Sequence, residues 1–260
     1  MKKLMCAVAA LSAGICMADI TSANIVGYNS LSVAPGSTAG MAVQFKDVAT
    51  GSIKIKDLVK VSTPKGGGTI GGTVDQIWTY DGNTWTKYFY YDARGVKKWL
   101  KTPVTTPATA LETEDTINNG QSFFFVRSSS GAVGDTVTLA GEVVALADKP
   151  EYPVTAGSTT AMAYPWPMAF KIKNFNQFNA NPKGGGTIGG TVDQIWTYDG
   201  NTWTKYFYYD ARGVKKWLKT PVSTPATALE TEDEIAVGQA FFFVRSSSGA
   251  AGDKITFKQL

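Results

Sequence analysis

Short runs of alternating hydrophobic and polar residues cover most of the chain, with turn-forming residues between them. Val, Ile, Thr, Tyr, Phe and Trp are frequent in the runs, and Gly, Pro, Asn, Asp and Ser separate them. No window of about 11 residues shows the 3.6-residue hydrophobic period of a helix. The pattern therefore predicts an all-β protein, with strands in its first half at residues 25–33, 41–45, 53–59, 74–80, 85–91, 97–101, 122–127 and 136–144.

A hairpin is predicted at residues 74–88, where two aromatic-rich runs flank Asp81-Gly82-Asn83. Asp-Gly is typical of such turns because these residues tolerate positive φ angles. The sequence leaves the loop at two, three or four residues, and a slip of one residue moves every side chain to the other face. Farther on, the run 123–126 is apolar at every position and predicts a central strand that is buried on both faces.

The body of the chain contains one pattern twice. Residues 64–138 recur at 182–256, an offset of 118, and only 8 of these 75 positions differ. Two homologous modules of about 120 residues follow from this repeat, a usual size for a domain. About eight short strands in each module predict a small β-sandwich or barrel. The predicted division is a signal peptide at 1–18, one module at 19–147 and the other at 148–260.

The first 18 residues have the features of an export signal. Lys2 and Lys3 precede an uncharged, mostly apolar run from Leu4 to Met17, and small residues at 16 and 18 favour cleavage before Asp19. Cleavage after residue 23, or a retained anchor, are the alternatives. The apolar run is short for a membrane span, and no later run is long enough, so the mature chain is expected to have no transmembrane segment. The predicted location is secreted, at the cell surface or periplasmic.

Composition excludes several kinds of chemistry. The chain has no His, and Cys6 and Cys16 both lie in the predicted signal. Catalysis by a histidine base or a cysteine nucleophile, disulfides and Cys/His metal sites are therefore excluded from the mature chain. Without residues 1–18 it has 23 basic and 21 acidic residues and no basic block, so nucleic-acid binding is not expected. We expect no metal and no cofactor.

Aromatic residues cluster in the hairpin of each copy. Exposed Trp and Tyr rings offer flat faces on which a sugar ring stacks, while polar neighbours bind its hydroxyl groups. The alternative is that these rings pack in the core as cross-strand pairs. The candidate ligand-binding residues are Trp78, Tyr80, Trp85, Tyr88, Tyr90, Trp99, Trp196, Tyr198, Trp203, Tyr206, Tyr208 and Trp217.

Three other features of the sequence contain residue types that could form a site. The Gly-rich run 65–73 lacks the Gly-Lys-Ser/Thr ending and the following helix of a phosphate loop, so it is expected to be a loop or turn. The acidic runs 112–115 and 230–234 are expected to be solvated, the alternatives being a weak Ca²⁺ site or a hydrolase pair. Ser128-Ser129-Ser130 has no base to activate a nucleophile. No catalytic residue is therefore assigned.

The order of several motifs resembles a group of secreted bacterial β-domain proteins that begin with an N-x-V-G-Y segment. The motifs are residues 24–28 (Asn-Ile-Val-Gly-Tyr), the Trp-Thr-Tyr-Asp-Gly-Asn-Thr-Trp hairpin, residues 120–126 and residues 136–144. This group has no established activity. The resemblance implies export and a β fold, and it transfers no active site.

Together these observations predict an exported, non-enzymatic tandem β-repeat protein. The leading hypothesis is that it binds carbohydrate or another cell-surface polymer through the aromatic hairpin faces, with two modules raising avidity. The alternative is a structural, self-assembling protein of the envelope or matrix, in which aromatic faces and edge strands pair between copies. A carboxylate-dependent glycan hydrolase is a lesser alternative.

Overall fold

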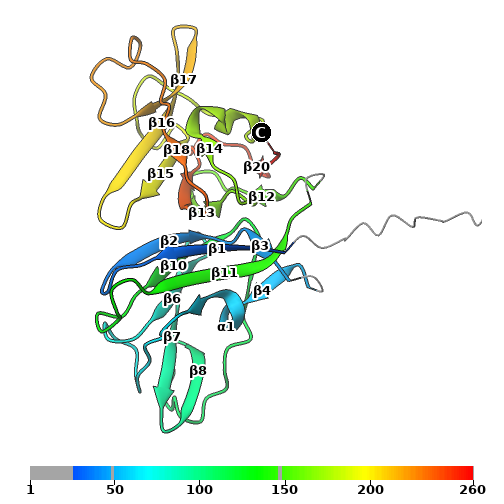
Figure 1. Ribbon diagram of the computed structural model, residues 1–260. Coiled ribbons are helices and arrows are strands. Elements are labelled where there is room, and N and C mark those ends of the chain that lie inside the picture. The colour runs from blue at the N-terminus through cyan, green and yellow to red at the C-terminus, as the bar shows by residue number, and fades with distance from the viewer. Residues whose placement is uncertain (1–25, 48–49, 146–147, 260) are drawn as a thin grey trace, which may run out of the picture.

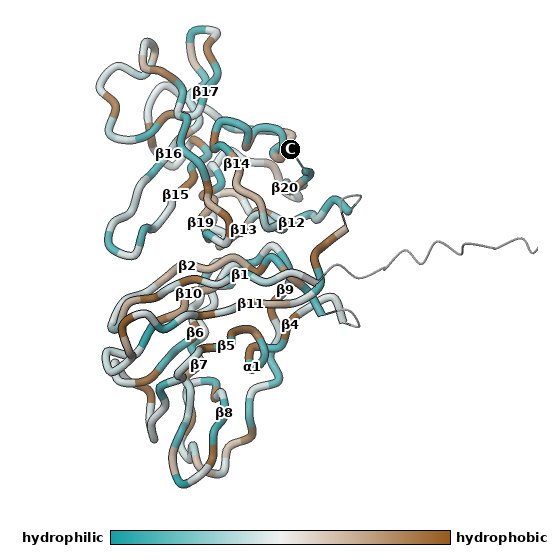
Figure 2. Tube along the Cα trace, viewed as in Figure 1, coloured by the Kyte–Doolittle hydropathy of each residue, from teal (hydrophilic) through white to brown (hydrophobic). Residues whose placement is uncertain are grey.

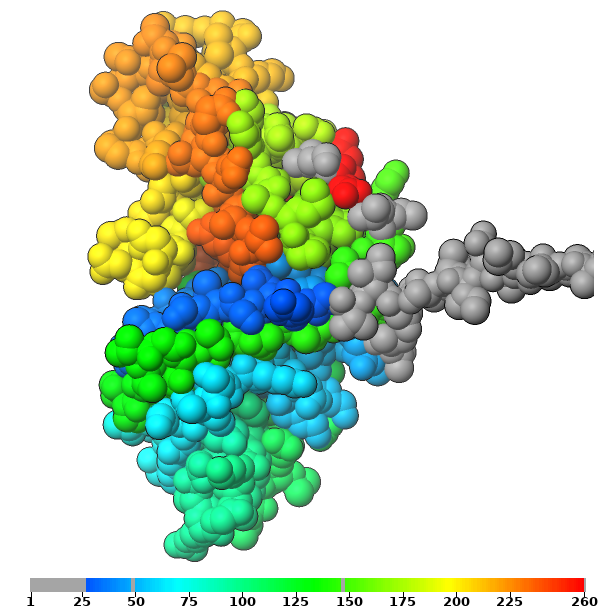
Figure 3. Space-filling model, in the orientation of Figure 1, coloured from blue at the N-terminus to red at the C-terminus, as the bar shows by residue number. Residues whose placement is uncertain are grey.

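The protein consists of two β lobes that lie in contact (Figures 1 and 3). The computed structural model describes residues 26–47, 50–145 and 148–259. We call residues 26–145 the first module and residues 148–259 the second module. The predicted signal peptide at 1–18 and residues 24–25 of the N-x-V-G-Y segment lie outside the described residues.

The first module contains two packed antiparallel sheets. One has the order β2-β10-β6-β7-β8, and in the other β11 lies between β1 on one side and β3 and β5 on the other. The strands β4 and β9 form a small third pair. The bounds are β1 (Val26–Ser32), β2 (Thr38–Ala42), β3 (Phe45–Lys46), β4 (Ser52–Lys54), β5 (Lys60–Val61), β6 (Gln76–Tyr80), β7 (Trp85–Ala93), β8 (Val96–Lys101), β9 (Thr116–Asn118), β10 (Ser122–Val126) and β11 (Thr136–Val143).

The second module has the same five-stranded sheet, in the order β13-β19-β15-β16-β17. Its other strands are short pairs, β12 with β20 and β14 with β18. The last strand is shorter here, with 3 residues in β20 against 8 in β11. The bounds are β12 (Glu151–Pro153), β13 (Thr159–Ala163), β14 (Phe170–Lys171), η1 (Ile172–Gln177), β15 (Gln194–Tyr198), β16 (Trp203–Ala211), β17 (Val214–Lys219), β18 (Glu234–Ile235), β19 (Ala240–Val244) and β20 (Lys254–Thr256).

The predicted all-β fold is confirmed, with one local correction. The run 53–59 was expected to be a strand, but the chain leaves β4 at Lys54 and forms a one-turn helix, α1 (Ile55–Leu58). Ile55 and Leu58 are three residues apart, so one helical turn buries both side chains in the core. Figure 2 shows hydrophobic residues around α1.

The hairpin register decides which aromatic rings share a face. Tyr80 pairs with Trp85, so the loop has four residues, and the side chain of Asp81 accepts the backbone N–H groups of Asn83 and Thr84 at 2.9 and 2.7 Å. Side chains alternate along a strand. Trp78, Tyr80 and Trp85 therefore lie on one face of the sheet, while the core residues Ile77 and Tyr88 lie on the other.

Strand β10 is central and buried, as its apolar run predicts. It lies between β2 and β6, and the side chains of Phe123 and Phe125 enter the sandwich core. Phe124 points the other way and yet is only 8% exposed. Since both faces of this sheet are apolar, a second layer must cover the outer face.

That layer is the other module. The two sheets meet in an approximate two-fold arrangement. The backbone N–H of Ala42, at the end of the edge strand β2, donates to Gly238 at 2.9 Å, and that of Ala163, at the end of β13, donates to Gly120 at 2.8 Å. Isolated bridges repeat the exchange, Met41 with Gln239 and Gln121 with Met162. Reciprocal contacts of this kind are characteristic of an isologous interface.

Phe124 and Phe242 form the centre of the interface. Their rings stack 5.8 Å apart at an interplanar angle of 26°, and Ala161 completes the buried cluster. Trp78, Tyr80, Trp196 and Tyr198 pack around it. At one edge, Gln44 of the first module is fully buried and donates to the carbonyl oxygen of Trp166 at 2.7 Å. The interface therefore combines an apolar centre with a polar edge.

A buried arginine joins the end of the sheet to the neighbouring loops in each module. Nη1 of Arg127 donates to Asp75 at 2.5 Å, and Nη2 contacts Asp135. Asp75 also accepts the backbone N–H groups of Ser128 and Lys65. The second module repeats this arrangement with Arg245, Asp193 and Asp253. Because both charges of the central pair are buried and paired, these residues have a structural role.

Replacing both central rings, Phe124→Ala with Phe242→Ala, should separate the modules without unfolding them, because each module keeps its own core. Each replaced ring removes about 3 kcal/mol of packing. We expect the single thermal transition of the wild type to split into two in calorimetry, and the radius of gyration in solution scattering to increase. Tyr28→Ala, at a ring 78% exposed on β1, is the control. An unchanged radius of gyration and transition in the double variant would contradict the interface.

Candidate functional site

Half of the aromatic candidates lie in the cores, and for these the predicted binding role is wrong. Trp217 is 0% exposed, and Trp99 is 5% exposed. With a hairpin loop of four residues, the side chain of Tyr88 and that of Tyr90, two positions farther along the strand, point to the core face of the sheet. The residues for which the predicted binding role is wrong are Tyr88, Tyr90 and Trp99 in the first module and Tyr206, Tyr208 and Trp217 in the second. Tyr90 is half-buried, and the other five are buried.

The other half lie on the face that the two modules share. Trp78, Tyr80, Trp196 and Tyr198 are half-buried in the interface. Trp85 and Trp203, each at the start of the second hairpin strand, are 41% and 45% exposed. The two hypotheses for the aromatics therefore each describe part of the cluster, since some rings form cores and others lie at a surface.

An open pocket of about 570 Å³ lies where the two hairpins meet. Phe242 lines it, with Trp203 stacked on its ring at 5.5 Å and Trp85 edge-on at 6.3 Å. The remaining lining residues are Tyr80, Thr159, Trp196 and Lys205. The pocket thus takes side chains from both modules and exists only when they are docked.

The polar atoms of two lining rings, Tyr80 and Trp196, have hydrogen-bond partners. Tyr80 donates its hydroxyl to the carbonyl oxygen of Gly82 at 2.8 Å, and Nε1 of Trp196 donates to Gln194 at 2.9 Å. These bonds hold the rings in place. The most exposed rings of the pocket are Trp85 and Trp203, at 41% and 45%. The described residues show no hydrogen bond for Nε1 of either tryptophan, for the hydroxyl group of Thr159, or for the ammonium group of Lys205, which lies over the Trp196 ring.

The acidic loops are held by lysines instead of forming a site. In the first module Glu114 contacts Lys54 and Lys56, and Asp115 contacts Lys101 at 2.8 Å. The second module repeats this with Glu232 and Asp233. Hydrogen bonds from Lys54 and Lys56 lower the pKa of Glu114 to about 2. With their oxygens occupied in this way, these carboxylates offer neither a calcium cage nor an acid–base pair.

The Gly-rich segment is a packed loop. A Cβ atom on Gly66 would lie 2.3 Å from the side chain of Asp92, so only glycine fits against β7. Gly71 accepts a hydrogen bond from the Gln76 side chain, which fixes the loop to β6. The hydroxyls of Ser128 and Ser130 bond each other at 2.8 Å within a turn. Both segments are structural.

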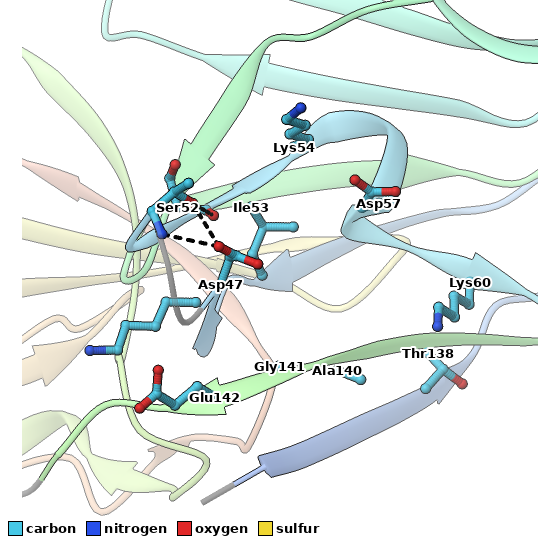
Figure 4. Close-up of a pocket in the computed structure, with 12 residues that line it drawn as sticks. Asp47, Ser52, Ile53, Lys54, Asp57, Lys60, Thr138, Ala140, Gly141 and Glu142 are labelled. Carbon is cyan, nitrogen blue, oxygen red and sulfur yellow. Dashed lines mark hydrogen bonds between the residues drawn. The ribbon is translucent and has the colours of Figure 1, made fainter. Parts of the chain in front are cut away.

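A second hollow, of about 500 Å³, lies beside β4 and β11 in the first module (Figure 4). Its carboxylates, Asp47, Asp57 and Glu142, come from different elements, and Asp47 accepts the backbone N–H of Thr50 at 3.0 Å. Across the described ranges, no group of three Asp, Glu, His or Cys side chains is placed to hold a metal ion. The carboxylates and lysines of this hollow therefore do not converge on one point where a ligand atom could be bound.

Three residues of the pocket, Thr159, Lys205 and Phe242, are not among the binding residues predicted from the sequence. For Lys205 the hairpin pattern was a usable signal, because a hairpin with a four-residue loop pairs Lys205 with Trp196. Phe242 was predicted to be buried as part of a central strand. That it would meet the other module was not foreseen.

Stability should decrease as the pH falls below about 5, because the paired carboxylates have folded pKa values below their unfolded ones. A group with a lowered folded pKa stabilises the fold above its unfolded pKa, about 4.3 for Glu, and loses that contribution as the pH falls through the folded value. We expect Glu114→Gln to lower the melting temperature at pH 7 and to leave it nearly unchanged at pH 2. Glu234→Gln, without an ion pair in the described part of the chain, is the control. An equal effect of Glu114→Gln at both pH values would contradict the ion pairs.

Comparisons with known proteins give no match, so the function has to be inferred from the geometry of the site. Among the described residues no helix is long and apolar enough to cross a lipid bilayer. No protein family model matches the sequence, and neither curated proteins nor solved structures give a match.

Proposed function

We propose that this chain is an exported, non-enzymatic tandem β-module protein that binds carbohydrate in the aromatic pocket between its modules. The observation that carries the proposal is the pair of partly exposed tryptophans, Trp85 and Trp203, which both contact Phe242. A pocket of about 570 Å³ lies within the range of about 300–1,000 Å³ usual for small-molecule sites.

The chemistry of the pocket suits a sugar ring. Trp203 is fixed by its stacking on Phe242 and by Tyr198 at 4.8 Å, so little conformational entropy is lost when a ligand binds. The C–H face of a sugar would stack on this ring, and the hydroxyl group of Thr159 and the ammonium group of Lys205 would bind its hydroxyl groups.

The absence of an enzymatic role is part of the proposal. A glycan hydrolase needs two carboxyl groups about 5 to 9.5 Å apart across the sugar. The residues that line the aromatic pocket include no Asp or Glu. The acidic loops, which were the lesser alternative, form ion pairs with lysines.

Trp203→Ala should weaken carbohydrate binding at least tenfold while the protein stays folded, because it removes the ring on which the apolar C–H face of the sugar would stack, and a tenfold change corresponds to about 1.4 kcal/mol. Retention on a panel of insoluble polysaccharides identifies the polymer class, and titration calorimetry with its oligosaccharides measures Kd. Tyr28→Ala removes an exposed ring away from the pocket and serves as the matched control.

Three outcomes are informative. Loss of binding in Trp203→Ala alone supports the pocket. Equal loss in Tyr28→Ala places binding elsewhere and contradicts it. If the wild-type protein binds no member of the panel, carbohydrate binding itself is refuted.

A second candidate, self-assembly, is favoured by the outer edge of β1. The aromatic faces meet each other within one chain, so they are not free to pair between copies. The described strands include none that pairs with the outer edge of this seven-residue strand, where Tyr28 and Leu31 are exposed. Such an edge is a template for pairing with another copy.

If β1 drives assembly, light scattering of the wild type should show a molecular mass that increases with protein concentration, and Tyr28→Lys should abolish the increase, because a charge on an edge strand opposes pairing. Leu111→Lys, at an exposed loop residue, provides the control for net charge. A monomer at all concentrations would exclude this candidate.

A further inference from the structure

The aromatic pocket contains one charged side chain among the residues that line it, Lys205. Its ammonium group lies 3.9 Å from the centre of the Trp196 ring, and it forms no ion pair with the described residues. By contrast, Lys171, Lys173 and Lys219 of the same module are each paired with a carboxylate. The positive charge at the pocket is therefore not neutralised by the protein.

The acidic residue in the hairpin turn does not supply that neutralisation. Asp199 lies in the β15–β16 turn, where its carboxylate accepts the backbone N–H groups of Asn201 and Thr202 and the hydroxyl of Thr202. It does not line the aromatic pocket. Groups of aromatic rings often bind cations, but an unpaired ammonium group within the site would repel one.

We propose that the pocket selects an anionic saccharide, in which a carboxylate or sulfate ester is bound by Lys205 while the sugar ring stacks on Trp203. This inference rests on the proposed function and specifies its ligand. Pairing of the anion with the ammonium group is a charge-assisted hydrogen bond, which is stronger than a neutral one. Thr159, which also lines the pocket, supplies a hydroxyl group.

The experiment compares matched ligands on the full chain. A galacturonic acid trimer, a galactose trimer and a sulfated galactose trimer are titrated by calorimetry at low and at physiological salt. We expect at least one anionic trimer to bind about tenfold more tightly than the neutral trimer, and the uronate and sulfate arms identify which anion is preferred. The preference should decrease with added salt.

Lys205→Gln should remove the preference by weakening anionic binding about tenfold, with neutral binding unchanged. Lys205→Arg should retain the preference, which separates the charge from any effect on folding. Lys97→Gln removes the same charge at an exposed site on β8, far from the pocket, and should bind like the wild type.

The failures are distinguishable. Equal binding of neutral and anionic trimers would overturn the anionic class and leave the proposed carbohydrate site standing. An equal loss in Lys97→Gln and Lys205→Gln would mean unspecific charge attraction and would also overturn it. No binding of any trimer or polysaccharide would refute the proposed function itself.

Discussion

Both faces of the five-stranded sheet in each module are apolar at its centre, and water cannot cover either of them without cost. The inner face packs on the sandwich core through Phe123 and Phe125. The outer face carries Phe124 with Trp78 and Tyr80, and no other described element of the first module covers it. The second module has a closely similar apolar face that includes Phe242. These two faces in one chain cover each other, and the docking of the modules follows from this constraint.

The aromatic pocket lies where the two modules do not completely cover each other's apolar faces. The first residues of β7 and β16, Trp85 and Trp203, contact Phe242 and keep part of their rings in water. The rings behind them are fixed by stacking and by hydrogen bonds to the turns. The arrangement therefore presents a rigid aromatic surface, with its polar groups supplied by β13 and β16 at Thr159 and Lys205. The same strands that stabilise the interface determine what a ligand would meet.

Much of the fold could be predicted from the sequence, because period-two patterns and Asp-Gly turns are local signals. The repeat at offset 118 predicted equivalent strands in the two halves, and the apolar run at residues 123–126 predicted a central strand. The one-turn helix at Ile55–Leu58 was missed because four residues are too few to show a helical period.

The site was harder to predict, since it depends on long-range pairing. The hairpin loop length decides whether Tyr88 or Trp85 faces outward, and sequence alone left that length open. Likewise, Asp75 and Arg127 are 52 residues apart and meet only because β6 and β10 are neighbours. The aromatic residues of this face are the same in both copies, which is a sequence signal that the two faces pack on each other. The pocket that results is apparent only in the docked structure.

The most direct test of module docking is a designed disulfide across the interface. A Cβ atom on Gly40 would lie 3.4 Å from the Cβ atom of Ala240, close to the usual separation in disulfides of about 3.5–4.5 Å. Gly40→Cys with Ala240→Cys in a chain that begins at residue 19, which has no other cysteine, should oxidise to an intramolecular disulfide, identified by mass spectrometry of the peptides. Two free thiols in the folded monomer, or cross-links only between chains, would contradict the face-to-face docking of the modules.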